Sequence, residues 1–331
     1  MGTGRGRGRA LLVTAVAVVL AGGCSGGGAP AAPQVEKPVL NVAVVPAVDS
    51  AGFFVALDQG LFKAHGLTVN FIAATSSETV ISQQVAGAYD ITGGNYVSYL
   101  QAQQQGRADL DIFAEASVMQ PGTQGIYTMP GSPITSLAGL QGQTVAINAP
   151  DNILFLLTAS VLTEYGVAPQ TVHFASIPFT EMPAELQSGA VGAAVLPEPF
   201  ASNAEQAQGG VPVADLDQGA TMSFPVEGYV VTKQWAARHP RTLAAFYAAL
   251  EEGQRIADTS RAAAERAMVD MPAPFGVSAE TAALMALDSY PVGSGPPGSA
   301  DKVRLQRVVD VMRQFLRFPR FDIGSMLMDR G

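Results

Sequence analysis

The stretch Val39-Leu-Asn-Val-Ala-Val-Val45 is a nearly continuous apolar run rich in β-branched residues. Runs of this kind are typical of strands that are buried on both faces of a parallel sheet. Pro46 ends the run, residues 51–64 place apolar side chains at helical spacing, and residues 68–73 have the composition of a second strand. The segment from 39 to 73 therefore predicts a strand-helix-strand unit of an α/β protein.

The same alternation continues along the chain in two series. The first has expected helices at 77–88 and 95–105 and expected strands at 89–92 and 110–118. A segment rich in Pro and Gly follows, and the second series then has strands at 144–148, 172–177, 190–196 and 211–216 and helices at 153–165, 181–188 and 199–208. This order predicts two α/β lobes with parallel sheets. Amphipathic helices at 241–259, 260–270, 278–287 and 301–317 are expected to pack back on the first lobe.

The N-terminal region has the features of an export leader. Three arginines precede an apolar run that is too short to span a membrane, and the small residues Ala21-Gly-Gly23 lie just before Cys24. This pattern resembles the lipobox of lipoprotein signal peptides. We therefore expect a signal peptide over 1–23, a lipid on Cys24 and a flexible tether over 24–38, which would anchor the protein on the outer side of the cell membrane. The alternative is an ordinary secretory leader with an incidental cysteine.

Composition and motifs exclude several classes of function. The formal net charge is −9 and no cluster of Lys or Arg follows the leader, so a nucleic-acid partner is not expected. The chain has one cysteine, no nucleophile elbow, no phosphate-binding loop and no zinc motif. Its three histidines, His65, His173 and His239, fall in separate elements. We therefore predict a binding protein without catalytic residues, metal or cofactor.

Polar and aromatic residues follow the expected strands, where an open α/β sheet forms its ligand crevice. Each group also precedes a helix, so these residues could equally act as N-caps. Several helix N-termini that face one cleft would supply free N–H groups, which favours a binding site. The predicted ligand-binding residues are Asp49, Ser50, Phe53, Thr75, Ser76, Asn95, Tyr96, Asn148, Asp151, Asn152, Phe179, Glu198 and Glu227.

The stretch Ala51-Gly-Phe-Phe-Val-Ala-Leu-Asp-Gln-Gly-Leu-Phe-Lys-Ala-His-Gly-Leu-Thr-Val69 resembles the opening signature of a family of ABC-importer substrate-binding proteins, the nitrate/sulfonate/taurine and thiamine-precursor group. Further matches lie at 82–92, 134–146, 185–193, 198–199 and 239–246. The resemblance implies a type 2 periplasmic-binding-protein fold with a hinge and an interlobe ligand cleft. It places lobe I at 39–125 plus 230–331, lobe II at 126–229 and the hinge near 120–130 and 224–231.

The resemblance also implies a function and its partners. A monomer would capture a small molecule between its lobes and deliver it to an ABC permease and ATPase complex, with no chemistry on the ligand. The candidate loops contain carboxylates and aromatic rings but no Lys or Arg, which favours a neutral or cationic heterocycle, such as a pyrimidine or another vitamin precursor. A sulfonate, taurine or nitrate-type oxyanion is the alternative. A ligand-sensing lipoprotein, or an enzyme related to thiamine pyrimidine synthase that uses His173, also stays open.

Overall fold

The computed structural model describes residues 1–4, 35–292 and 301–328. The expected signal peptide is mostly outside this range, as are Cys24 and the tether as far as residue 34. One compact unit begins at Val35. Within the described residues, no helix combines the length and the apolar character that crossing a membrane requires.

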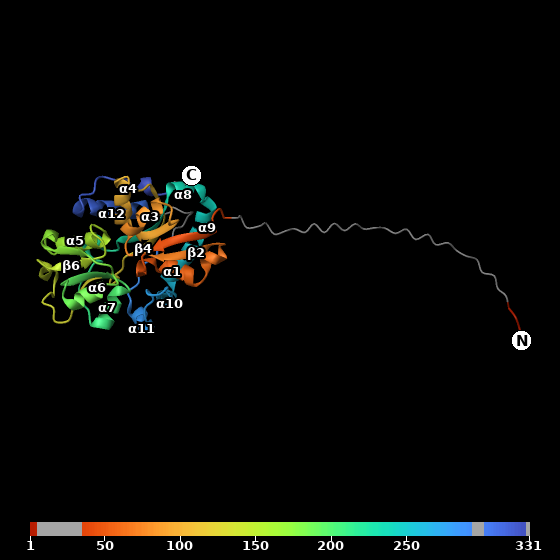
Figure 1. The fold of residues 1–331 in the computed structure, drawn as a ribbon, viewed down its shortest axis with the longest axis horizontal. Coiled ribbons are helices and arrows are strands. Elements are labelled where there is room, and N and C mark those ends of the chain that lie inside the picture. Colours follow the sequence, from red (N-terminus) through yellow and green to blue (C-terminus); the bar gives the residue numbers. More distant parts are fainter. Residues whose placement is uncertain (5–34, 293–300, 329–331) are drawn as a thin grey trace. The chain divides into compact units, whose positions relative to one another are not determined.

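Two five-stranded sheets form the centre of the unit (Figure 1). The first, which we call the sheet of lobe I, has the order β2 (Thr68–Ala73), β1 (Val39–Val44), β3 (Ile91–Asn95), β10 (Pro225–Thr232) and β4 (Leu110–Val118). The second, the sheet of lobe II, has the order β7 (His173–Ser176), β6 (Thr144–Ile147), β8 (Ala193–Pro197), β5 (Gln124–Thr128) and β9 (Val211–Asp215).

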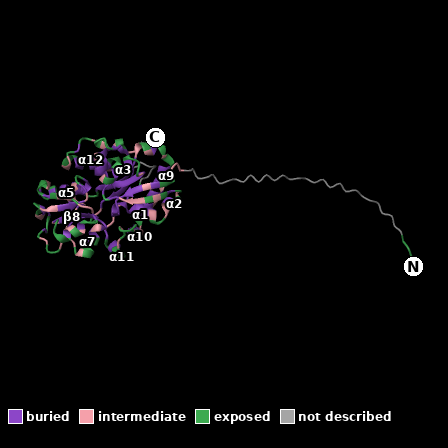
Figure 2. Cartoon of the chain, in the orientation of Figure 1, coloured by how far each residue is buried: buried purple, intermediate pink, exposed green. Residues whose placement is uncertain are grey.

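Helices pack around both sheets, and buried residues fill the interior between these layers (Figure 2). Lobe I carries α1 (Ala51–Asp58), α2 (Leu61–Ala64), α3 (Ser77–Val85), α4 (Tyr96–Gln104), α8 (Lys233–Arg238), α9 (Pro240–Thr259) and α10 (Arg261–Val269). Lobe II carries α5 (Ile153–Glu164), α6 (Met182–Ser188) and α7 (Phe200–Gln208). Short 3-10 turns lie at η1 (Val48–Ser50), η2 (Leu137–Leu140), η3 (Pro169–Thr171), η4 (Gly219–Thr221) and η5 (Ile323–Met326).

The expected two α/β lobes are confirmed, but the sheets are mixed and not wholly parallel. β10 runs antiparallel to β3 and β4, and β5 runs antiparallel to β8 and β9. Both are the strands with which the chain crosses from one sheet to the other. Because each enters its sheet from the side of the other lobe, it runs against its neighbours. β5 begins at Gln124, so residues 124–125, which were expected in lobe I, pair in the sheet of lobe II. β10 begins at Pro225, so residues 225–229, which were expected in lobe II, pair in the sheet of lobe I.

Two local expectations differ from the structure. The helix expected over 51–64 is broken into α1 and α2 at Gly60, whose φ of 69° is in the left-handed region. β3 runs through Gly93 and Gly94, which were expected in a loop. A Cβ at Gly94 would overlap the Ser77 hydroxyl, so this glycine lets α3 approach the strand closely.

The chain is ordered before Val39, where the sequence predicts a flexible tether. The Glu36 carboxylate accepts hydrogen bonds from the backbone N–H of Arg241 and Thr242, at 3.2 and 2.8 Å. These N–H groups belong to the first turn of α9, which has free donors and a favourable dipole for an anion. Residues 35–38 are therefore held against lobe I.

The C-terminal helices connect both lobes and do not cover lobe I alone. α9 and α10 pack on α1, as expected, but α11 (Ala279–Leu284) also contacts α7 of lobe II. α12 (Lys302–Phe315) contacts α4 of lobe I and α5 of lobe II, and it lies near both in Figure 1.

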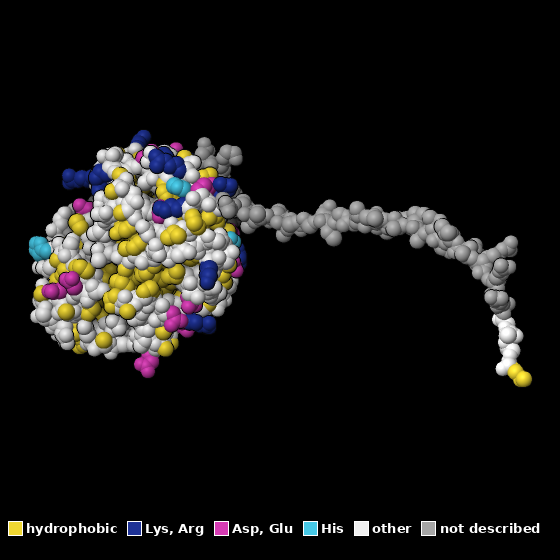
Figure 3. Space-filling model, turned by 45° about the vertical axis from the view of Figure 1, so that its right-hand side comes forward, with side chains coloured by type: hydrophobic (Ala, Val, Ile, Leu, Met, Phe, Trp, Pro, Cys, Tyr) yellow, Lys and Arg dark blue, Asp and Glu magenta, His cyan; other side chains and the backbone are white. Residues whose placement is uncertain are grey.

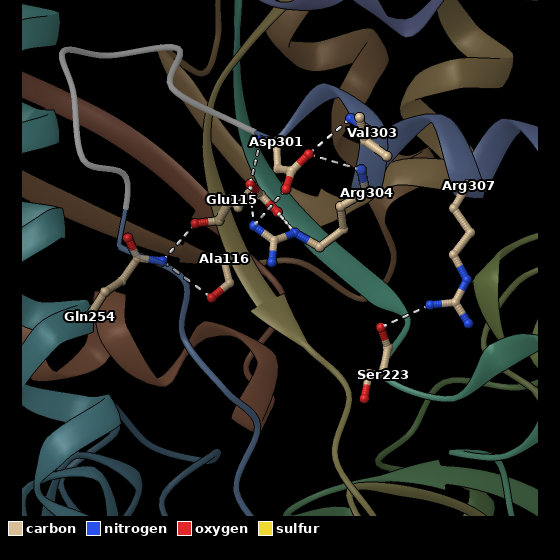
Figure 4. A network of polar contacts seen from close by, with 8 residues as sticks. All are labelled: Glu115, Ala116, Ser223, Gln254, Asp301, Val303, Arg304 and Arg307. Carbon is tan, nitrogen blue, oxygen red and sulfur yellow. Dashed lines mark hydrogen bonds and ion pairs between the residues drawn. The ribbon is translucent and has the colours of Figure 1, made fainter.

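A buried ion pair anchors the N-terminal end of α12 to lobe I (Figure 4). Arg304 Nε donates to Glu115 of β4 at 2.8 Å, and the Arg304 Nη2 atom donates to the same carboxylate at 3.1 Å. Asp301 caps α12 and donates its N–H to Glu115 at 2.7 Å. One turn further on, Arg307 donates to carbonyl groups in the segment 220–223, which leads into β10. α12 is thus fixed to the sheet of lobe I and to one crossing segment.

We predict that Arg304→Met lowers the free energy of unfolding by about 1–3 kcal/mol, because it leaves the Glu115 carboxylate buried without its cation. Arg313→Met is the matched control, since Arg313 is exposed on the same helix. Urea unfolding measures both. Equal stability of the two variants would show that the ion pair does not hold α12.

Gly253 of α9 lies against Gly52 of α1, and an alanine methyl there would overlap the Gly52 carbonyl oxygen and the Cβ of Ala56. We expect Gly253→Ala to destabilise the protein by about 1–3 kcal/mol through overpacking. Gly139→Ala is the control, because its methyl would meet Ile134 no closer than 3.4 Å. A thermal unfolding midpoint of Gly253→Ala equal to that of the control would contradict this packing.

Candidate functional site

A small cavity lies where the two lobes meet, and it contains polar groups from both. Its volume is about 30 Å³, which leaves room for about two water molecules. The lining residues are Val45, Ala47, Asp49, Ser77 and Asn95 of lobe I, Gln124, Asn148, Ile153, Leu154, Phe179 and Pro197 of lobe II, and Val226 and Glu227 of β10. The cavity is therefore walled by both lobes and by both crossing strands.

Three helix N-termini point their first turns toward this cavity. Each begins at a side-chain cap that the sequence marks as a candidate site residue. The Asn95 carbonyl oxygen accepts from Ser98 N–H at 2.9 Å, and the Asn152 oxygen accepts from Leu154 N–H at 3.1 Å. Ser76 caps α3. These residues therefore act as N-caps, and they position the cavity wall through the helices that they begin.

The acidic side of the cavity is formed by Asp49 and Glu227. Asp49 Oδ1 accepts hydrogen bonds from Gln124 Nε2 at 3.1 Å and from the Ser117 hydroxyl at 3.3 Å. The Ser50 hydroxyl donates to Glu227 Oε2 at 3.0 Å. Burial raises the pKa of Glu227 well above its usual value, and the nearby Asp49 carboxyl raises it further.

The amide of Gln124 is only half satisfied. Its side chain is 1% exposed, and its Nε2 donates to Asp49, whereas its Oε1 has no hydrogen-bond partner. An unpaired buried acceptor is costly unless a donor reaches it. Together with the two carboxyl groups, this oxygen makes the wall rich in acceptors.

Several predicted site residues join the lobes through backbone groups. The Val48 N–H donates to the carbonyl of Glu198 at 2.9 Å, Asn148 Nδ2 donates to the carbonyl of Thr75 at 3.4 Å, and Gln101 Nε2 donates to the carbonyl of Asp151 at 2.9 Å. The Asn148 oxygen also accepts from Asn152 at 2.6 Å. These contacts hold the lobes together around the cavity.

Eight predicted site residues do not line the cavity: Ser50, Phe53, Thr75, Ser76, Tyr96, Asp151, Asn152 and Glu198. Phe53 is fully buried in the core of lobe I, where its ring lies 5.4 Å from that of Phe54. Tyr96 is buried against Gly228. Asp151 is exposed, and the Glu198 carboxylate turns toward Ser202, whose hydroxyl donates to it at 2.7 Å.

Phe179, by contrast, lines the cavity and is supported from behind. Its ring stacks on Phe200 with centroids 5.0 Å apart and an angle of 24° between the planes. An aromatic pair of this kind gives a flat, rigid apolar surface. It forms the apolar wall opposite the acidic groups of lobe I.

Sequence reasoning missed Gln124 and Asp288. Gln124 lies in a segment read as a Pro/Gly-rich break, although that break was also the expected hinge. Asp288, which contacts Asp49, lies just after the helix expected over 278–287, and no local pattern marks it. It reaches the site because Ser289 forms an isolated bridge with Val118 of β4.

Basic side chains do not reach this site in the part of the chain that the structure describes. No described Lys or Arg lines the cavity, and on the face drawn in Figure 3 the basic residues are scattered around the periphery, while hydrophobic side chains gather in a central band. No group of three or more His, Cys, Asp or Glu in the described residues could hold a metal ion. The cavity thus combines acidic groups, a free acceptor and an aromatic wall.

Comparisons with known proteins agree with this architecture. The chain is 28% identical over 238 residues to the bicarbonate transport ATP-binding protein CmpC of Synechocystis, and this match covers 66% of the chain but only 35% of that relative. The chain therefore spans about a third of that relative's length.

Two solved structures share the fold. One is a ligand-binding component of an ABC-type import system from Staphylococcus aureus, solved with zinc bound (TM-score 0.73, 14% identity, 88% of this chain and 96% of that one). The other is the alkanesulfonate-binding protein SsuA from Xanthomonas axonopodis pv. citri bound to MOPS (TM-score 0.72, 16% identity, 88% and 99%). They confirm the periplasmic-binding-protein fold. The NMT1-like family matches residues 33–271, so the chain belongs to that family, as its resemblance to the nitrate and sulfonate receptors indicates.

Proposed function

We propose that the protein is an extracytoplasmic solute receptor that encloses a small molecule between its lobes and presents it to an ABC importer. The observation that carries this proposal is the cavity itself, because both lobes and both crossing strands contribute to its wall. The lobes lie close together and leave room for only about two water molecules, so a larger ligand requires them to separate. Contacts of the ligand with both lobes would then favour closure around it. A permease that recognises the closed form would then receive loaded protein.

The chemistry of the wall supports a neutral or cationic nitrogen heterocycle as ligand. The carboxyl groups of Asp49 and Glu227 and the free Oε1 of Gln124 offer acceptor oxygens to a ligand that donates hydrogen bonds. The Phe179 ring offers a face for stacking or for a cation. A pyrimidine that carries an amino group meets both requirements.

An oxyanion is the second candidate. The relatives named for sulfonate and bicarbonate favour it, and so do the N-termini of α3, α4 and α5 at the cavity. The acidic wall opposes it, because no described Lys or Arg balances the carboxyl groups there. An enzyme that uses His173 has less support, since this residue is exposed on β7 and does not line the cavity.

The location follows from the leader. We propose that 1–23 is removed, that Cys24 carries a lipid and that a tether keeps the receptor beside its permease as a monomer. Such a tether raises the local concentration of loaded receptor. A sensor that signals the closed state would use the same arrangement without transport.

A panel of amines, neutral pyrimidines, sulfonates, nitrate and bicarbonate should separate the ligand classes by thermal shift. We expect aminopyrimidines to raise the unfolding midpoint, and Phe179→Ala to weaken their binding about tenfold by removal of the aromatic wall. Phe174→Ala is the matched control, because Phe174 pairs with Phe155 outside the cavity. Stabilisation by oxyanions alone would contradict the preferred ligand class.

The anchor is tested separately. We expect Cys24→Ala to release the receptor from membranes into the medium or periplasm, because the sole thiol that can take the lipid is lost. Membrane fractionation with an antibody measures this. Retention of the variant in the membrane fraction to the same extent as the native protein would contradict the lipid anchor.

A further inference from the structure

Three carboxyl groups are buried together beside the cavity, and they come from distant parts of the chain. Asp49 follows β1, Glu227 lies in β10 and Asp288 follows α11. Their exposed fractions are 4%, 5% and 5%. Asp49 and Glu227 line the cavity, and the Asp288 carboxyl contacts that of Asp49 from behind. Among the described residues, no Lys, Arg or His forms a hydrogen bond or ion pair with any of the three.

The surroundings of these carboxyl groups are neutral or acidic on every side. Asp49 faces the hydroxyl of Ser117 and the amide of Gln124, and Glu227 faces the hydroxyl of Ser50. Asp288 lies near the hydroxyl of Thr123. The titratable neighbours include the phenols Tyr96 and Tyr99 of α4, Tyr229 of β10 and Tyr290 of the C-terminal segment.

Without ligand, this group must hold protons. Three buried carboxylates without a cation would cost far more than their neutral forms. Both oxygens of Asp288 lack a hydrogen-bond donor, yet its carboxyl touches that of Asp49, so the pair is satisfied when it shares a proton. Burial raises the pKa of Asp288 well above its usual value, and the adjacent Asp49 raises it further.

A second feature of the cavity, the side-chain amide of Gln124, lacks a hydrogen-bond donor. Gln124 uses its Nε2 on Asp49, and its buried Oε1 has no partner. Gln124, Asp49 and Glu227 line the same space. Water can donate a hydrogen bond to this oxygen, but an ammonium or amidinium group placed there would also neutralise the carboxylates.

We propose that Asp49, Asp288 and Glu227, with the Oε1 of Gln124, form a proton-exchange subsite for a positively charged nitrogen group of the ligand. The proposal rests on the proposed function as a solute receptor. When the cation enters, at least one carboxyl proton leaves to solvent, and N–H···O hydrogen bonds to the carboxylates replace it. Release reverses the exchange.

The direction of the pH dependence distinguishes this subsite from an oxyanion site. While the pH lies below the raised pKa values, each proton released on binding makes the affinity for a cation rise about tenfold per pH unit. An oxyanion that accepts hydrogen bonds from protonated carboxyl groups would bind more weakly as the pH rises. A neutral ligand would show little change.

The test combines infrared spectroscopy and calorimetry on the full protein. The ligand-free protein should show the carbonyl stretch of protonated, buried carboxyl groups at neutral pH, and methylammonium or an aminomethyl-substituted aminopyrimidine should reduce it. Titration calorimetry of the aminopyrimidine in two buffers of different ionisation enthalpy should show proton release of about one per ligand. The hydroxymethyl counterpart, matched in shape but uncharged, should release none.

Substitutions of single carboxyl residues show which of these groups carry the protons. Asp288→Asn and Glu227→Gln should each reduce the infrared band and the number of protons released. Asp111→Asn is the control, because Asp111 is a half-buried carboxyl of β4 whose pKa is also raised by burial but which does not line the cavity. It should leave proton release on binding unchanged.

Unfolding provides a readout that needs no ligand. A carboxyl with a raised folded pKa lowers stability progressively as the pH rises from its unfolded value toward its folded value. Asp288→Asn should therefore raise the unfolding midpoint more at pH 7 than near pH 3, which lies below the ordinary Asp pKa of about 3.9, so that this carboxyl is mostly protonated in both the folded and the unfolded chain.

The subsite would be overturned by a ligand-free protein without a protonated carboxyl band, or by a band that no amine of the panel reduces. Proton uptake with nitrate or methanesulfonate would overturn it as well, while leaving the solute receptor intact. The proposed function itself would fail if no amine, neutral pyrimidine, sulfonate, nitrate or bicarbonate stabilised the protein.

Discussion

The chain crosses between its two sheets through β5 and β10, and each crossing strand lies inside a sheet and not at its edge. β10 pairs with β3 and β4, and β5 pairs with β8 and β9. The connection between the lobes is therefore part of both hydrogen-bonded sheets. Gln124 begins one crossing strand and Glu227 lies near the start of the other, so the same constraint delivers both side chains to the cavity.

Carboxyl groups beside the cavity differ from those elsewhere in the fold in the partners that they have. Elsewhere in the fold, buried or half-buried carboxylates have partners, as Arg304 is for Glu115 and the first turn of α9 is for Glu36. Beside the cavity, Asp49 and Glu227 have only neutral donors. Groups left unsatisfied at a binding site commonly reduce stability in exchange for function. A ligand that supplies the missing positive charge would compensate for these buried carboxyl groups.

The repeating pattern of strands and helices predicts most of the fold, because apolar spacing and caps act locally. The strand over 39–45, the helix after Asn152 and the helix after Asn95 all follow from such signals. β5 was not predicted, because it is short and lies between Pro-Gly pairs, and its pairing depends on strands far along the chain. The antiparallel direction of the crossing strands is likewise a consequence of topology, which no local pattern encodes.

The candidate site was predictable only in part, for a related reason. Position after a strand indicates nearness to the crevice but not the direction of a side chain, so Asp49 and Phe179 line the cavity whereas Phe53 turns into the core. Asp288 arrives through a long-range bridge and carries no local signal. The most direct test of the account is a crystal structure with the compound that most raises the unfolding midpoint. We predict ligand density between the lobes in contact with Asp49, Gln124 and Glu227, whereas ligand bound to one lobe alone would contradict an interlobe site.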